Sequence, residues 1–154
     1  MTHVSGIDTA SNDPWPWSSP QDSDSVTLLL AGDINIQYRD NPADALENVR
    51  ATLQQADLVY GNLEGLFVES QGPHRDIPDK GGWQHVGPRA VEALTSSNIA
   101  VVGLANNVAF GPENILATIA VLDAHGVAHT GAGPNIEAAH EPAVVERKGV
   151  RFGF

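Results

Sequence analysis

An apolar run, a helical repeat and a second apolar run follow one another in residues 98–133, NIAVVGLANNVAFGPENILATIAVLDAHGVAHTGAG. Each apolar run is short and ends at glycine or asparagine, which is typical of a strand in a parallel sheet. Between the runs, a helix is predicted to begin at Gly111-Pro112 and to end at Gly126. Its apolar residues share one stripe: Ile115, Ile119 and Leu122. The stretch therefore predicts a strand–helix–strand unit.

The same alternation extends in both directions from this unit. Upstream, the pattern predicts a strand in VTLLLAGD (26–33) that is buried on both faces, a helix over 42–56, a strand over 57–60 and a helix beginning at Pro88. Downstream, it predicts a short helix within 134–142 and two strands around the turn 147–149. Strands that alternate with helices indicate an α/β fold with a mainly parallel sheet.

Composition excludes several classes of partner. The chain has 154 residues, a formal net charge of −11 and no cysteine. Binding to nucleic acid or to an anionic membrane requires clustered Lys and Arg, so neither is expected as a partner. No apolar run reaches the roughly 18 residues of a membrane span. The N-terminus lacks the pattern of a signal peptide, and we expect a soluble, cytoplasmic protein.

The composition of the sequence changes near residue 26. Residues 1–25 are rich in Ser, Asp and Pro and predict a flexible tail, within which Trp15 and Trp17 are candidates for docking on a partner or on the domain. Residues 26–154 predict one α/β domain. This domain ends inside an apolar strand at 152–154, which exposes a hydrophobic edge, so we expect it to be truncated at its C-terminus.

Polar residues lie at the end of three consecutive predicted strands. Asp33 follows the first strand, Asn62 and Glu64 follow the second, and Asn106 and Asn107 follow the third. Ligands of α/β proteins bind beyond the carboxyl ends of the strands, where such oxygen donors suit a divalent metal or a polar substrate. Each motif alone is also compatible with a turn. Their coincidence at three strand ends favours a site.

The histidines give a weaker signal. His74 and His85 lie in a long Gly- and Pro-rich loop, from Ser70 to Pro88, and long loops often carry functional residues. Either histidine is a candidate to close over the site, although loop histidines are usually solvated.

Three motifs, LLLAGD, ADLVYGNLEG and LANNVAFGPENILATIAVLDAHGVAHTGAG, resemble the CapA family of capsule and poly-γ-glutamate synthesis proteins. The resemblance runs from Val26 to Phe154. It implies a metallophosphoesterase-like (calcineurin-like) β-sandwich flanked by helices, of which this chain holds about half as βαβ units. The C-terminal half, with the family's later histidines, is then expected to lie beyond Phe154.

The resemblance also implies roles for the polar residues. It implies that Asp33, Glu64 and Asn106 are catalytic and that Asp33 and Asn62 are candidate metal ligands. We expect the substrate to be bound by Asn62 and Asn107, together with the loop histidine His85. The family usually has histidine after the paired asparagines, whereas this chain has Val108. Valine has no lone pair for a metal. We therefore expect either no cofactor or a weakly bound Mn, Fe or Zn ion.

Three functional hypotheses follow. The first is a CapA-like enzyme, hydrolase-like in its chemistry, that acts on a polyamide or peptidic substrate. The second is a metal-independent peptide epimerase that uses Asp33 as one member of an acid/base pair. The third is a non-catalytic domain that binds polymer or a partner protein. The loss of histidine at Val108 favours the second, while the retained polar set argues against the third.

Overall fold

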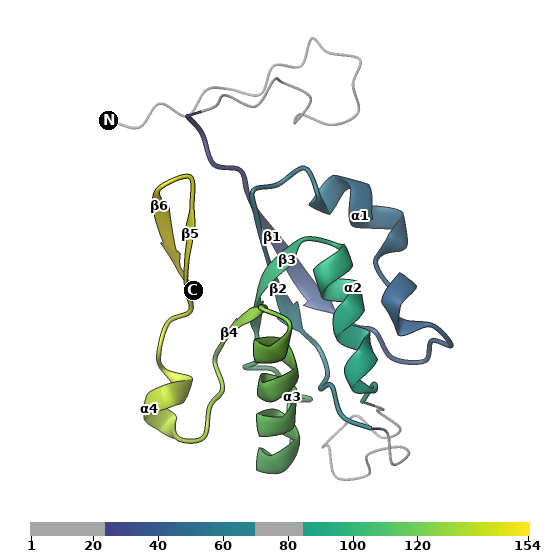
Figure 1. Cartoon of the computed structure of the whole chain (residues 1–154). Helices are drawn as coiled ribbons and strands as arrows, with labels where there is room; N and C mark the ends of the chain where they lie inside the picture. Colours follow the sequence, from purple (N-terminus) through teal and green to yellow (C-terminus); the bar gives the residue numbers. More distant parts are fainter. Residues whose placement is uncertain (1–23, 70–84) are drawn as a thin grey trace.

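Four parallel strands in the order β1-β2-β3-β4 form the main sheet of the structure, a computed structural model that describes residues 24–69 and 85–154 (Figure 1). The strands are β1 (Leu28–Ile34), β2 (Leu58–Leu63), β3 (Ile99–Gly103) and β4 (Ala128–Thr130). Every neighbouring pair is parallel, which confirms the predicted α/β fold. The predictions for the N-terminal tail, with its two tryptophans, and for His74 fall almost entirely outside the described residues.

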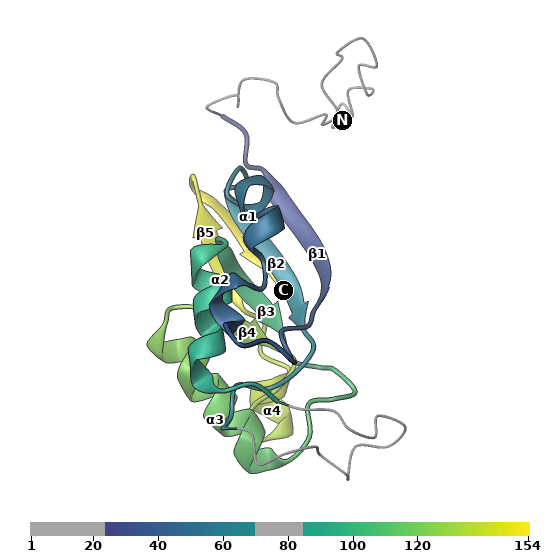
Figure 2. The same cartoon turned by 90° about the vertical axis from the view of Figure 1, so that its right-hand side faces the viewer.

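Helical segments connect the parallel strands and cover one face of the sheet (Figures 1 and 2). They are η1 (Pro42–Asp44), α1 (Glu47–Leu53), η2 (Pro88–Ala90), α2 (Val91–Ser96) and α3 (Pro112–Ala124). The main core lies between these helices and the sheet. Its buried members include Leu53, Val59, Leu63, Leu94, Val102 and Leu122.

A β-hairpin packs on the opposite face of the sheet (Figure 1). It consists of β5 (Val144–Arg147) and β6 (Val150–Gly153), preceded by α4 (Ile136–Ala139). Its turn lies within the predicted 147–149 and uses Lys148 and Gly149 at positive φ, which is typical of a tight hairpin. A second core cluster, built on Leu58 and Val101, joins the hairpin to the sheet. We call the two sides of the sheet the helix face and the hairpin face.

The prediction that the first strand is buried on both faces is wrong. In the described sheet β1 is an edge strand, and Leu28 and Leu30 are 37% and 66% exposed. The leucine run encodes an apolar strand but not its position in the sheet. The hairpin covers the middle strands and leaves these two leucines open.

Two boundaries also differ from the prediction. The helix predicted over 42–56 is divided into η1 and α1, because Leu46 departs from helical dihedrals at φ −108° and ψ 12°. Strand β2 continues to Leu63 instead of ending at Tyr60. Asn62 therefore lies on a strand, and so does Asp33. A strand fixes the direction of a side chain more firmly than a loop does.

Candidate functional site

Asp33 and Asn62 are direct neighbours on β1 and β2. They are register partners in the sheet, and Asn62 Nδ2 donates a hydrogen bond of 2.6 Å to Asp33 Oδ1. A carboxylate only accepts hydrogen bonds, so this contact fixes which end of the Asn62 amide faces Asp33. Asp33 is exposed and Asn62 is half-buried. The pair is therefore ordered and accessible at the carboxyl end of the sheet.

A second polar pair follows just beyond the first. Asn35 and Glu64 each lie two residues after a member of the first pair, and alternation along an extended chain places them on the same face. Asn35 Nδ2 donates to Glu64 Oε2 at 3.2 Å, while Asn35 Oδ1 accepts from the Gln37 backbone N–H at 3.2 Å. Asn35 thus fixes the position of the Glu64 carboxylate. The sequence analysis missed Asn35, although its spacing from Asp33 was a usable signal.

The first pair belongs to a row that crosses the whole sheet. Gly103 of β3 is the register partner of Asn62, and Thr130 of β4 is the register partner of Gly103. Thr130 Oγ1 donates to the Phe154 carbonyl at 3.3 Å, which links the row to the end of the hairpin. Because register partners share a face, Asp33 and Asn62 face the hairpin side of the sheet.

The paired asparagines form a tight turn after β3. Asn106 Oδ1 accepts a hydrogen bond from the Val108 N–H at 3.1 Å, and the Asn106 carbonyl accepts one from the Ala109 N–H at 3.1 Å. This is the side-chain-supported turn that asparagine commonly makes. Asn107 is exposed. The geometry gives Asn106 a structural use, and its catalytic role stays a prediction.

Val108 is completely buried, with 0% of its surface exposed. The position where the family usually has histidine is therefore an apolar packing position in this chain. An imidazole placed there would lose its contact with water and would need a buried partner.

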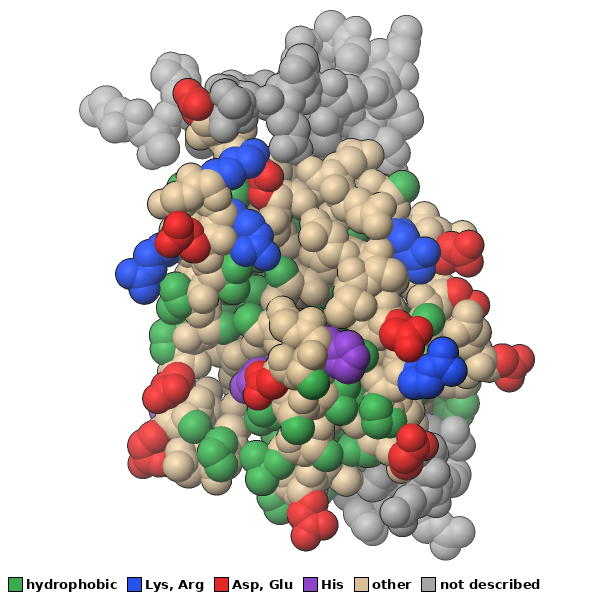
Figure 3. Space-filling view, viewed as in Figure 1, with side chains coloured by type: hydrophobic (Ala, Val, Ile, Leu, Met, Phe, Trp, Pro, Cys, Tyr) green, Lys and Arg blue, Asp and Glu red, His purple; other side chains and the backbone are tan. Residues whose placement is uncertain are grey.

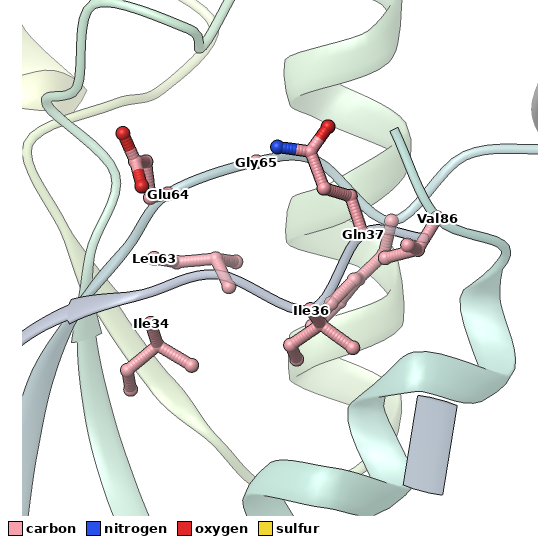
Figure 4. Close-up of a pocket in the computed structure, with 8 residues that line it drawn as sticks. Ile34, Ile36, Gln37, Leu63, Glu64, Gly65 and Val86 are labelled. Atoms are coloured by element: carbon pink, nitrogen blue, oxygen red, sulfur yellow. The ribbon is translucent and has the colours of Figure 1, made fainter. Parts of the chain in front are cut away.

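A small hollow lies between the loops that follow β1 and β2 (Figure 4). Its enclosed volume is about 10 Å³, close to that of a single water molecule. Glu64 and Gln37 lie along one side of it, and Ile34, Ile36 and Leu63 lie along the other (Figure 4). The hollow is too small for a substrate. A large ligand that contacts Glu64 would have to do so at the surface.

His85 is buried, with only 3% of its surface exposed. Its Nδ1 atom accepts a hydrogen bond from the Leu66 N–H at 3.2 Å, a contact that anchors the histidine to the chain after β2. The expected movement of His85 over the site would require this contact to break. Its proposed role in substrate binding stays a prediction.

The described residues do not fit the divalent metal that the resemblance implies. Among them, no three His, Cys, Asp or Glu side chains gather closely enough to hold an ion. Asn106 Oδ1 already accepts the hydrogen bond from the Val108 N–H, and the Val108 side chain offers no donor atom.

On the face shown in Figure 3, basic side chains occur among acidic ones. None of the helices in the described ranges, 24–69 and 85–154, is long and apolar enough to cross a membrane.

Comparison with known proteins extends the resemblance seen in the sequence. A family model described as "Bacterial capsule synthesis protein PGA_cap" matches residues 27–154. The match confirms the similarity carried by the three motifs. No curated protein matches the chain significantly.

Proposed function

The chain belongs to the bacterial capsule synthesis protein family PGA_cap, and on this premise we propose that it acts on a polyamide or peptidic substrate at the carboxyl end of its sheet. The observation that carries the proposal is the hydrogen-bonded pair of Asp33 and Asn62 on neighbouring strands, in which the Asp33 carboxylate is exposed. Ordered polar groups at this edge are the usual basis of ligand binding in α/β proteins.

The chemistry of the pair favours an amide ligand. Asp33 accepts hydrogen bonds, and Glu64 adds a second carboxylate near the same edge. An amide N–H is a suitable donor for these oxygens. The carboxylates of poly-γ-glutamate would be repelled, so we expect the site to contact the amide units of such a polymer. Added salt should then leave binding unchanged or strengthen it.

In this proposal Asp33 is the acid/base residue and Asn62 orients it. Glu64 and Asn107 contribute to substrate contact at the rim. A second candidate, metal-independent peptide epimerisation, is favoured by the buried Val108 and by the lack of a metal-ligand cluster among the described residues. There, Asp33 would remove a proton from a substrate Cα, and a second acid would return one to the opposite face.

Incubation with a poly-γ-glutamate oligomer in D₂O tests these proposals together. Hydrolysis shortens the polymer, whereas epimerisation leaves its length unchanged and introduces deuterium at inverted Cα positions. Mass spectrometry and chiral amino-acid analysis distinguish the two products. Binding without either change would indicate a non-catalytic binding domain.

Substitution of Asp33 locates the activity. We expect Asp33→Asn to reduce turnover by about 100-fold, the scale of a lost general acid or base. Glu113→Gln is the matched control, because Glu113 is an exposed acidic residue at the start of α3. Equal turnover by Asp33→Asn and wild type would contradict the proposed site.

A further inference from the structure

Tyr60 lies beside the proposed site and was not among the predicted residues. It precedes Asn62 by two positions on β2, so both side chains lie on the hairpin face. Its ring stacks on Phe154 with centroids 5.2 Å apart and ring planes 1° apart. A stacked ring keeps its hydroxyl in a defined position, and ordering that hydroxyl costs little further entropy on binding.

The Tyr60 hydroxyl and the Asn62 amide oxygen border one space above Gly103. A Cβ atom added to Gly103 would clash with the hydroxyl and would lie 3.4 Å from Asn62 Oδ1. Glycine at this position therefore makes room for both polar atoms. Gly103 has no left-handed backbone that would require glycine for another reason.

The hydroxyl remains available for a ligand. Within residues 24–69 and 85–154 it makes no hydrogen bond to another group. Asn62 Nδ2 already donates to Asp33, so the Asn62 oxygen is the end of that amide turned toward the space above Gly103. The cluster thus combines one free donor with nearby acceptors.

We propose that Tyr60 is a substrate-binding residue, whose hydroxyl donates a hydrogen bond to the carbonyl of an amide unit while Asp33 accepts from an adjacent N–H. This inference rests on the proposed function and specifies the ligand chemistry of the same site. An amide presents a donor and an acceptor, which complement the carboxylate of Asp33 and the phenol of Tyr60.

Tyr60→Phe removes the hydroxyl and keeps the ring stacked on Phe154. We expect it to weaken binding of a poly-γ-glutamate oligomer by about 3- to 10-fold, the scale of one hydrogen bond, as measured by calorimetry. The thermal midpoint should not change. Tyr38→Phe is the matched control, since the chain has only two tyrosines and Tyr38 lies outside the sheet.

Gly103→Ala provides a second variant, because its methyl group would occupy the space that the polar atoms border. We expect weaker binding again with a folded protein, monitored by circular dichroism. If wild type binds the oligomer, Asp33→Asn weakens binding and Tyr60→Phe does not, the inference fails and the proposed function stands.

If wild type does not bind the oligomer, the proposed substrate is wrong, and N-methylacetamide then decides the inference. This small amide is titrated while the ring signals of both tyrosines are followed by NMR. Shifts of the Tyr60 signals that are absent in Gly103→Ala would support an amide-binding cluster. Equal or absent shifts at Tyr60 and Tyr38 would overturn it.

Discussion

Asp57 at the amino end of the sheet is enclosed by partners, whereas Asp33 at the carboxyl end is exposed. Asp57 Oδ2 accepts from the Thr27 N–H at 2.8 Å, and both of its oxygens lie 3.0–3.1 Å from Lys148 Nζ. Only 17% of the Asp57 side chain is exposed. Within the described residues, Asp33 has one hydrogen bond, from Asn62.

The two regions use an aspartate for different purposes. The Asp57 cluster joins the starts of β1 and β2 to the turn of the β5–β6 hairpin, where Arg147 Nε also donates to the Asp57 carbonyl at 3.1 Å. The Asp57 carboxylate is occupied by contacts within the protein. The Asp33 carboxylate retains capacity for a ligand. Unused capacity at an ordered position is thus the feature on which we base the proposed site at Asp33, in contrast to the structural cluster at Asp57.

The largest expected effect on stability comes from Val108→His, which tests whether the carboxyl end can be converted to a metal site. Because Val108 is fully buried, the imidazole would overpack the core and lose its contact with water. We expect a loss of about 2–4 kcal/mol in the free energy of unfolding, measured with urea. Val144→His on the half-exposed β5 strand is the matched control and should change little.

Calorimetry with Mn²⁺ or Zn²⁺ completes this test. We expect no gain in metal affinity, since the new side chain lies in the core. An unchanged unfolding free energy together with tight metal binding would show that the valine only replaces a ligand in an otherwise intact centre.

Asp57→Asn should have the next largest effect, and that effect should depend on pH. The Thr27 N–H and then the Lys148 ammonium lower the pKa of Asp57 below its ordinary value of 3.8. A lowered pKa in the folded state stabilises the protein above the unfolded value, and this contribution is lost as pH falls through the folded value. At pH 7 we expect the variant to melt about 2–4 °C lower.

The difference between wild type and Asp57→Asn should shrink below about pH 4, where Asp57 begins to be protonated in the unfolded chain. Thermal melts from pH 2 to pH 7 measure it. Asp40→Asn, at an exposed position outside this cluster, is the control. If the difference in thermal midpoint were as large at pH 2 as at pH 7, the substitution would act through the shape of the side chain and not through its charge.

The sequence predicted the order of elements better than the partners of individual residues. Periodicity and glycine or proline boundaries are local, so the strand–helix alternation and the hairpin turn at Lys148-Gly149 were visible. The pairing of Asp33 with Asn62 joins residues 29 positions apart, and that register is a property of the assembled sheet. Tyr60 was missed for the same reason, because its importance depends on neighbours across the strands.

The smallest effect on stability should come from Asp33→Asn, the counterpart of Asp57→Asn at the other end of the sheet. The asparagine has nearly the same shape and can still accept the hydrogen bond from Asn62. Since Asp33 is exposed and bridges no distant elements, we expect a thermal midpoint within about 2 °C of wild type, as for most surface substitutions. A midpoint lowered as much as that of Asp57→Asn would place Asp33 among the structural groups. Unchanged stability combined with lost turnover would instead show that the carboxylate is kept for a ligand.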